Sequence, residues 1–331
     1  MTHADDIARR RAPGNETPSL DTVSVVIVTH DSERDLPRCL GPLIGLGSEI
    51  VVVDSRSTDG SVALVRREFP SVDVIELDRN VGYGGANNVG IAATSGRYVL
   101  VLNPDAWPVD DAVRRLVRAA DELPRAAVVG PRLVGADGER QLSIRGFPTL
   151  WRLATEFFFV RWFAPGSRAL NAFYGAGVDP EARAEVEWLM GAAILLRREA
   201  LDDVGLFDPA FFMYSDEVDL AYRLREAGWS VAYEPDATFV HLGGSSTSAS
   251  PIEYYRELLR SHVRFMDKHR GRRAARRTRV LLLASMRVRS LVLPRDRRRI
   301  ARAAAAWLGE HDVDSLLRLP DDAQTAPSAS S

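Results

Sequence analysis

The stretch Val23-Ser-Val-Val-Ile-Val-Thr29 decides the fold, because it is an unbroken, mostly β-branched run that ends at the polar turn His30-Asp31-Ser32. Such a run is typical of a strand that is buried on both faces of a parallel sheet. A helical stretch through Leu46 follows, and then a second run, Glu49–Asp54, which ends in an acid. This alternation predicts an α/β fold whose sheet binds ligands at the carboxyl ends of its strands.

The same alternation continues along the chain. The segment from Ser57 to Ser61 predicts the cap of a helix that runs to about Phe69. A Gly/Asn-rich loop over 82–93 is expected to run into another helix. Further strands are predicted at 72–77, 97–102, 126–129, 187–196 and 230–233. Together these elements predict a mostly parallel, doubly wound sheet.

Length and composition set the domain plan. With 331 residues, 46% of them apolar, the chain can form one large α/β domain and an appendage. We expect a disordered leader at 1–20 and a main domain at 21–250, divided into halves at 21–125 and 126–250. A basic helical extension at 251–315 and a disordered tail at 316–331 complete the plan.

Compartment signals are few. The single Cys39 excludes an internal disulfide and fits a reducing cytoplasm. The first twenty residues lack the apolar segment of a signal peptide. No window reaches the roughly 18–20 uninterrupted apolar residues of a membrane span. The net charge of -2 says little about partners.

Acids follow three of the predicted strands, at Asp31, Asp54 and Asp105. Asp54 could accept hydrogen bonds from a nucleotide base or ribose, although a helix N-cap network is the more common reason for an acid at that place. Asp105, after Asn103-Pro104, could hold a hard divalent cation on a diphosphate, but an ordinary turn has the same sequence.

Two further motifs are weaker. The loop from Asn80 to Gly90 would let a ligand approach the backbone closely, yet no Gly-Lys-Ser/Thr follows it and its glycines do not follow the first strand. It is therefore neither a Walker loop nor a dinucleotide fingerprint. His241 precedes a Gly/Ser loop and could bind metal or phosphate, although a lone histidine is more often structural.

The segment Asp216-Glu217-Val218-Asp219-Leu220 places three carboxylates within four positions. Crowding raises the pKa of at least one of them, which suits a general base. An acid-rich helix N-terminus would have the same composition, and Arg223 could pair with Asp219 at i+4. We interpret Asp219 as structural, which leaves Asp216 and Glu217 for chemistry.

Taken together, these pieces resemble glycosyltransferase family 2, within its rhamnosyltransferase-like branch. The resemblance covers about Val23 to His269 and rests on six segments in the family's order. They are VSVVIVTHDS, VVVDSRSTDGS, NVGYGGANNVGI, VLVLNPDAWP, WLMGAAILLRREALDDVGLFDPAFFMYSDEVDLAYRLREAGW and FVHLGGSST.

The resemblance implies a GT-A fold, with a nucleotide-binding half at 21–125 and an acceptor half at 126–250. It implies an inverting hexosyltransferase that uses a nucleotide-diphosphate sugar, with dTDP-rhamnose favoured, and Mg²⁺ or Mn²⁺. The acceptor would be a glycan, on a polyprenyl diphosphate in much of this branch, in cell-envelope biosynthesis.

Site residues carry over by position. Asp105 and His241 would hold the metal, and Asn103 replaces the first acid of the family's metal motif. Glu217 falls at the position of the catalytic base, and Asp216 is its competitor. The nucleotide would contact Thr29, Asp31, Asp54, Gly82, Asn87 and Asn103.

The extension raises a separate question. Roughly fifteen basic residues fall between His262 and Arg302, interleaved with Leu281–Leu283 and Leu291–Leu293. A basic amphipathic helix favours contact with the inner face of the plasma membrane, whereas packing of the leucines on the domain would leave only solvated arginines. Nucleic acid could bind the same patch, but nothing else in the chain supports it.

Three other functions fit less well. A sugar nucleotidyltransferase should have a Gly-rich loop after the first strand, and THDSERDLP has none. Transfer of another hexose, onto a polysaccharide or a secondary metabolite, would use the same motifs. An inactive nucleotide-sugar-binding protein would be expected to lose some of the acids and His241.

Overall fold

A computed structural model describes residues 20, 22–164, 166–243 and 251–318. The predicted leader therefore lies outside the described residues except for Leu20. Of the predicted tail, only residues 316–318 are described, and Leu316 is buried at the end of the last helix. The Gly/Ser loop after His241 lies outside the described residues beyond Gly243.

The first half of the domain forms the parallel part of the sheet. Strands β1, β2, β3 and β4 lie in the order β3-β2-β1-β4 and all pair in parallel, as predicted. The elements are β1 (Val23–Thr29), α1 (Leu36–Leu40), a 3-10 turn (Gly41–Leu43), β2 (Glu49–Asp54), α2 (Ser61–Glu68), β3 (Asp73–Glu76), α3 (Gly82–Ala92) and β4 (Tyr98–Leu102). Helix α3 begins at Gly82, so the predicted loop there is helical from its first residue.

The second half extends the sheet to the order β3-β2-β1-β4-β10-β6-β11-β5, with β8 also paired to β11. Strand β10 is antiparallel to both β4 and β6, whereas β6 and β11 are parallel. The elements are β5 (Ala106–Pro108), α4 (Ala112–Glu122), β6 (Ala126–Val134), β7 (Ile144–Arg145), α5 (Leu150–Phe157), η2 (Val160–Phe163), η3 (Ala172–Tyr174), β8 (Ala184–Val186), β9 (Trp188–Leu189), β10 (Ala193–Arg197), α6 (Arg198–Val204), α7 (Asp216–Glu226) and β11 (Ser230–His241).

The single strand predicted at 187–196 is wrong. Strand β9 pairs with β7 in a separate small sheet, and β10 belongs to the main sheet. Between them the chain turns toward α3, where the hydroxyl of Tyr83 donates to the carbonyl oxygen of Gly191 at 2.8 Å. A polar contact from a distant helix therefore divides what reads as one apolar run.

Both faces of the main sheet are buried. In β1 the side chains of Val26 and Val28 join one hydrophobic cluster, and those of Val25 and Ile27 join the other. This alternation explains why the strand reads as uniformly apolar, because neither of its faces meets solvent.

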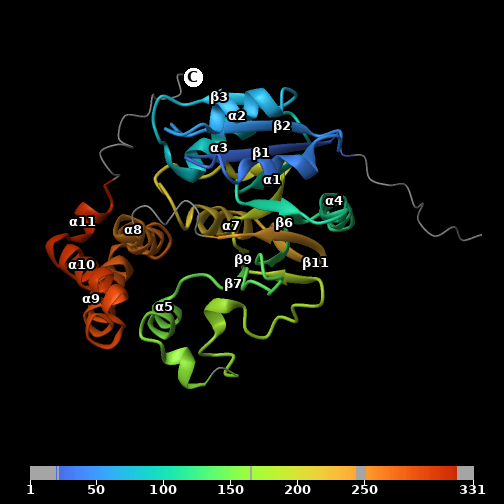
Figure 1. The fold of residues 1–331 in the computed structure, drawn as a ribbon. Helices are drawn as coiled ribbons and strands as arrows, with labels where there is room; N and C mark the ends of the chain where they lie inside the picture. The colour runs from blue at the N-terminus through green and yellow to red at the C-terminus, as the bar shows by residue number, and fades with distance from the viewer. Residues whose placement is uncertain (1–19, 21, 165, 244–250, 319–331) are drawn as a thin grey trace, which may run out of the picture.

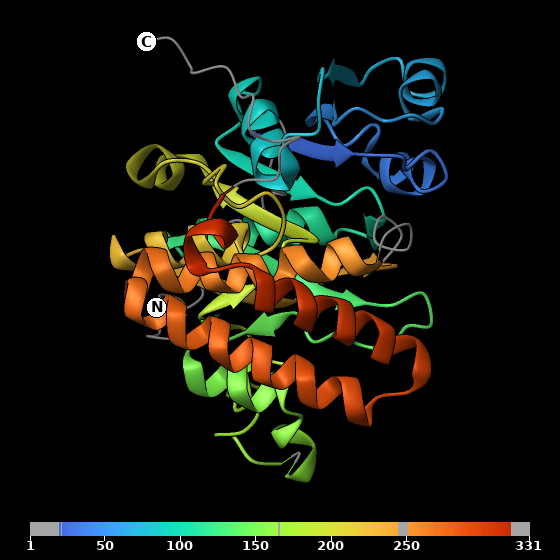
Figure 2. The ribbon, with the colours of Figure 1, turned by 90° about the vertical axis from the view of Figure 1, so that its left-hand side faces the viewer.

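The extension is helical, as predicted, and packs against the domain. Its helices are α8 (Pro251–Arg270), α9 (Arg272–Val292), α10 (Arg295–Glu310) and α11 (Val313–Leu316). They gather at one side of the molecule in Figure 1, and α9 and α10 lie across the face turned to the viewer in Figure 2. Leu259, Leu282 and Trp307 join the same hydrophobic cluster as Val26. Part of the extension therefore belongs to the hydrophobic core of the main domain.

Candidate active site

A cavity of about 570 Å³ opens where the carboxyl ends of β1, β2 and β4 meet the first turn of α7. Helix α8 also contributes to its wall, so the extension helps to form the site. Of the ten predicted site residues, six line the cavity: Gly82, Asn103, Asp105, Asp216, Glu217 and His241. The other four, Thr29, Asp31, Asp54 and Asn87, lie outside its lining.

Thr29 and Asp54 are register partners at the ends of β1 and β2. Asp54 accepts a hydrogen bond from the backbone N–H of Ser57 through Oδ2 at 3.0 Å. Its Oδ1 and the Thr29 hydroxyl are buried without a hydrogen-bond partner among the described residues. Buried polar atoms normally have partners, so this pair is prepared for hydrogen bonds that the protein does not supply.

Asp31 has a different position. It is exposed, in a left-handed conformation, and its carboxylate accepts hydrogen bonds from the backbone N–H of Thr58 and Asp59 at 2.6 and 3.2 Å. These bonds, led by that from Thr58, lower the pKa of Asp31. The carboxylate therefore shapes the loop after β2.

The start of α3 closes one side of the cavity. Gly82 has a φ of +79°, and a Cβ there would overlap the carbonyl of Phe212, so only glycine fits. Asn80 holds this turn by accepting a hydrogen bond from the backbone N–H of Gly82 at 2.9 Å. Asn87 is fully buried one turn into the helix, where its side-chain N–H donates to the carbonyl of Tyr83 at 3.0 Å.

Sequence reasoning did not identify three cavity residues near the carboxyl ends of the first strands, namely His30, Ser55 and Asn80. His30 follows β1, and its Nδ1 lies 2.9 Å from the carbonyl oxygen of Ser55. The Ser55 hydroxyl in turn donates to Asn80 at 3.2 Å. His30 and Ser55 directly follow β1 and β2, and Asn80 comes shortly after β3. These positions were the available signal, but polar residues are ordinary in turns.

Asp105 and His241 come together across neighbouring strands, because β5 pairs with β11 directly beside them. Oδ1 of Asp105 lies 3.5 Å from Nε2 of His241. Gln141, which the sequence did not single out, has its amide oxygen 2.9 Å from Nδ1 and its amide nitrogen 2.7 Å from the His241 carbonyl oxygen. This arrangement assigns the imidazole proton to Nδ1.

Burial lowers the pKa of His241, although the charge of Asp105 opposes the shift. A neutral ring with its proton on Nδ1 turns the lone pair of Nε2 toward the Asp105 carboxylate. Two acceptors facing each other at this distance suit a divalent cation, which takes carboxylate oxygen and imidazole nitrogen as ligands. The described residues contain no group of three such side chains, so the remaining ligands would come from substrate or water.

The paired acids lie at the first turn of α7. Asp216 is 2% exposed, whereas Glu217 is partly exposed to the cavity. Burial raises the pKa of Asp216 well above its ordinary value, and the neighbouring Glu217 charge and hydrogen bond raise it further. Neither has an ion pair with a cationic side chain in the described part of the chain. Burial and the adjacent carboxylate therefore both favour the protonated form of Asp216.

The backbone before α7 is strained. Tyr214 and Ser215 have φ values of 64° and 60°, in the left-handed region that non-glycine residues seldom adopt. Such conformations cost of order 1–3 kcal/mol each and gather at functional sites. The Tyr214 hydroxyl and Nε1 of Trp188 are buried at the cavity without a described hydrogen-bond partner. Both residues line the cavity.

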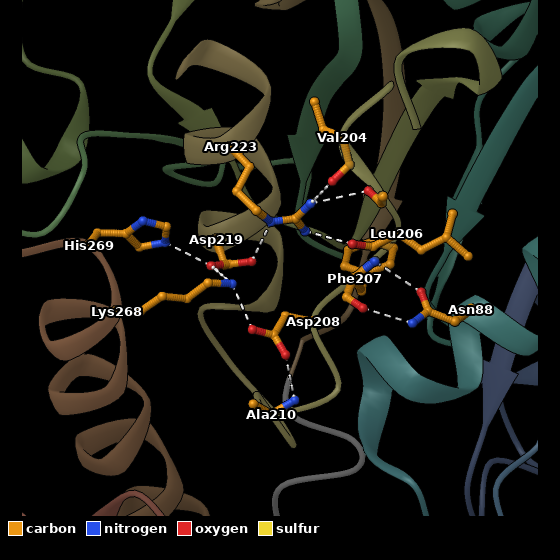
Figure 3. Close-up of polar contacts among 11 residues, drawn as sticks. Asn88, Val204, Leu206, Phe207, Asp208, Ala210, Asp219, Arg223, Lys268 and His269 are labelled. Atoms are coloured by element: carbon orange, nitrogen blue, oxygen red, sulfur yellow. Dashed lines mark hydrogen bonds and ion pairs between the residues drawn. The ribbon is translucent and has the colours of Figure 1, made fainter. Parts of the chain in front are cut away.

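Asp219, three residues beyond Asp216, has a wholly different environment (Figure 3). It is fully buried and contacts Arg223 at 2.8 Å, Lys268 at 2.7 Å and His269 at 2.7 Å. Although burial opposes the shift, hydrogen bonds from these three residues lower the pKa of Asp219. The predicted structural pair with Arg223 is confirmed. The contacts of Asp219 with Lys268 and His269 also join α7 to the end of α8.

Comparison with known proteins places this geometry in context. The sequence profile of "Glycosyl transferase family 2" matches residues 24–219. The N-acetylglucosaminyl-diphospho-decaprenol L-rhamnosyltransferase of Mycobacterium tuberculosis is 33% identical over 267 residues, which cover 76% of this chain and 86% of that protein.

Solved structures agree on the fold. Mannosyltransferase PcManGT from Pyrobaculum calidifontis, solved with GDP-Man and Mn²⁺, gives a TM-score of 0.52 at 18% identity, covering 89% of this chain and 77% of that one. GalNAc-T7, solved with UDP, GalNAc and Mn²⁺, gives 0.54 at 16% identity, covering 87% and 56%. The predicted GT-A fold is confirmed.

Proposed function

The chain belongs to glycosyltransferase family 2, in its rhamnosyltransferase-like branch, and on that premise we propose that it transfers L-rhamnose from dTDP-rhamnose to a polyprenyl-diphosphate-linked glycan of the cell envelope. The observation that carries the proposal is that one cavity holds both Glu217 beside the buried Asp216, whose pKa is raised, and Asp105 facing His241. The relative from Mycobacterium tuberculosis, named as such a rhamnosyltransferase, supports the sugar and the acceptor.

The donor nucleotide would lie at the ends of β1 and β2. Asp54 Oδ1 and the Thr29 hydroxyl are the atoms without partners there, so we assign them to the base or ribose. Gly82 and Asn103 line the adjacent wall. Asp31 would act from outside the cavity, by holding the loop over 57–59 in place.

Asp105 and His241 would hold Mg²⁺ or Mn²⁺ against the donor diphosphate. When bound, such an ion stabilises the negative charge of a departing diphosphate. The role of the protein is to present one carboxylate and one neutral imidazole, and Gln141 fixes the imidazole by its bond at Nδ1.

Glu217 would act as the base. It accepts the proton of the acceptor hydroxyl while that oxygen bonds to the anomeric carbon, and the bond from that carbon to the phosphate oxygen breaks on the opposite face. The configuration is thereby inverted. Protonated Asp216 would donate a hydrogen bond to Glu217 and hold its carboxylate in position, because Asp216 itself is too buried to reach an acceptor.

The test is a transfer assay with the purified chain, Mn²⁺, a short-chain prenyl diphosphate carrying N-acetylglucosamine, and a donor panel of dTDP-rhamnose, UDP-glucose, UDP-N-acetylglucosamine and GDP-mannose. The proposal expects transfer from dTDP-rhamnose, with an inverted anomeric centre by NMR. Transfer from another donor only would support the alternative hexose. Nucleotide binding without transfer from any donor would support an inactive binding protein.

We also propose that the chain works at the cytoplasmic surface of the plasma membrane. No helix among the described ranges is both long and apolar enough to span a bilayer. Yet the large side chains of Trp162, Phe163 and Leu291 are exposed by 69%, 87% and 72%. Arg289 of α9 bonds the Phe157 carbonyl and stacks on Phe159, so the η2 segment and the end of α9 lie together. Exposed arginines along α9 would add attraction to anionic lipid.

Each of the two interpretations of the basic extension, packing on the domain and contact with a membrane, therefore fits a different part of α9. Leu282 is buried and Leu281 and Leu283 pack against the core, whereas Leu291 and Val292 are exposed. Sedimentation with anionic and neutral liposomes tests the membrane contact. We expect binding to anionic vesicles at low salt that weakens in the double variant Trp162→Ser/Phe163→Ser, whereas Arg118→Gln on α4 leaves it unchanged. Absence of binding at low salt would remove the proposal.

A further inference from the structure

The far end of the cavity contains an arginine whose role the transfer reaction described above does not explain. Arg145, on β7, is the register partner of Trp188 on β9, and both line the cavity. Its neighbours there are Phe173, Tyr174 and the buried His262. This end is apolar and aromatic, unlike the polar end lined by His30, Ser55 and Asn80.

The guanidinium of Arg145 is partly buried and lies 4.2 Å from the ring centre of Tyr174 and 5.9 Å from that of Phe173. Within the described residues it has no hydrogen bond and no ion pair. Glu187, next to its register partner, is already paired with Arg152. A guanidinium held between rings without an anion retains five unused donors, a geometry that matches phosphate oxygens.

Charge at this end favours an anion. Arg161 stacks on Tyr174 at 4.3 Å and pairs with Glu156 at 3.2 Å. Arg289 is occupied by the Glu156 and Phe157 carbonyls and by the Tyr255 hydroxyl, but no carboxylate neutralises it among the described residues. Three guanidinium groups thus share one carboxylate. His262 adds no charge at neutral pH, because burial lowers its pKa to about 4.

Arg145 lies on a different part of the cavity wall from the residues proposed to hold the donor diphosphate. Asp105 and His241 sit at the ends of β4 and β11, whereas Arg145 lies in the small sheet beyond Trp188. From Arg145 the contacts lead through Tyr174 to Arg161, and Arg161 stacks on the exposed Trp162 at 5.6 Å. The path runs from the reacting centre toward the surface assigned above to the membrane.

We propose that Arg145 is the anchor of an acceptor subsite, where its guanidinium binds a phosphate of a prenyl-diphosphate-linked sugar. The inference rests on the proposed function and names the binding group for its acceptor. The prenyl chain would leave past Tyr174 toward Trp162 and Phe163, and the sugar hydroxyl would reach Glu217. An acceptor held by its diphosphate explains why an apolar wall carries an unpaired cation.

The experiment compares two acceptors that bear the same sugar, one on a short prenyl diphosphate and one on a neutral alkyl group. We expect Arg145→Gln to lower kcat/KM for the diphosphate acceptor about ten- to a hundredfold, the usual range for a hydrogen bond to a charged group. For the neutral acceptor kcat/KM should not change, nor should KM for the donor. Arg118→Gln, on the outer face of α4, is the matched control. Equal losses with both acceptors, a raised donor KM or no loss would each overturn the proposal.

A binding measurement separates this inference from the proposed function. Geranyl diphosphate with EDTA should raise the melting temperature of the wild type and of Asp105→Asn, but not of Arg145→Gln, and inorganic diphosphate should act more weakly. This result would support the subsite even if no sugar were transferred from dTDP-rhamnose. Stabilisation of Arg145→Gln equal to that of the wild type, or none in the wild type, would contradict the subsite while leaving the transferase assignment in place.

Discussion

Two carboxyl sites on one helix, a turn apart, behave in opposite ways. At the start of α7, Asp216 and Glu217 meet the cavity with no cationic partner among the described residues. Asp219, by contrast, is buried and contacts Arg223, Lys268 and His269 (Figure 3). The pKa of Asp216 at the first site is raised, whereas that of Asp219 at the second is lowered. One sequence motif thus contains a reactive pair and a structural anchor.

The difference teaches how surroundings assign roles to identical side chains. Burial alone makes the charged form of a carboxyl unfavourable, whereas burial with hydrogen-bonded cations makes it favourable. The cations around Asp219 come from its own helix and from the end of α8. The extension therefore holds α7 in place while its first turn faces the substrate.

Removing the charge of Glu217 should have the largest effect. In Glu217→Gln we expect kcat to fall about 10²–10⁴-fold, the usual contribution of a general base, while the donor KM stays near that of the wild type. Steady-state transfer kinetics measure both. An active Glu217→Gln enzyme combined with an inactive Asp216→Asn enzyme would reverse our assignment of the two acids.

Asp219→Asn should act on stability. The change leaves Arg223, Lys268 and the imidazole of His269 without their buried carboxylate partner. Breaking a buried pair in this way costs about 3 kcal/mol or more. Urea unfolding at pH 7.5 measures the loss. Asp314→Asn, whose carboxylate is largely exposed, is the control and should cost little. Unchanged stability in Asp219→Asn would contradict the anchor.

His262 extends the comparison to a buried base that has no charged partner in the part of the chain that the structure describes. Its pKa is lowered to about 4 by burial, so between pH 6.5 and 4 the unfolded chain binds a proton that the native protein does not. This group should therefore reduce the free energy of unfolding by about 1.4 kcal/mol per pH unit as the pH falls through that range. His262→Gln should flatten that slope in urea titrations. An unaltered slope would mean that the imidazole is protonated in the native state.

The smallest effect should come from Asp216. Its pKa is raised in the native state, so above pH 3.8 the unfolded chain loses a proton that the native protein keeps, and stability falls as the pH rises toward the native pKa. Asp216→Asn removes this cost. We expect its melting temperature at pH 7.5 to equal or slightly exceed that of the wild type, with the gain disappearing near pH 4. A large loss at pH 7.5 would show that an ionised Asp216 supports the fold.

Much of this could be predicted from sequence. The bounds of β1 and β2 agree with the apolar runs, because a strand buried on both faces imposes its composition directly. Asp105, His241, Asp216 and Glu217 follow from motifs, and the cavity brings them together.

What could not be predicted depends on contacts between distant segments. Gln141 lies 100 positions from the His241 it orients, and its side chain would be ordinary in any loop. Arg145 stands out only because Tyr174 stacks on it and no carboxylate of the described residues pairs with it. The break between β9 and β10 coincides with the hydrogen bond from the Tyr83 hydroxyl of α3 to Gly191. None of these leaves a local periodicity that a sequence pattern can reveal.

The most direct test of the account is a thermal-shift titration with dTDP, UDP and GDP, with and without Mn²⁺, on the wild type, Glu217→Gln and Asp105→Asn. A ligand that binds only the native state raises the melting temperature by mass action. The account predicts Mn²⁺-dependent stabilisation by dTDP of the wild type and Glu217→Gln, and little or none of Asp105→Asn. Absence of a shift with every nucleotide, or an equal shift in Asp105→Asn, would contradict the claim that this cavity holds a metal-bound nucleotide sugar.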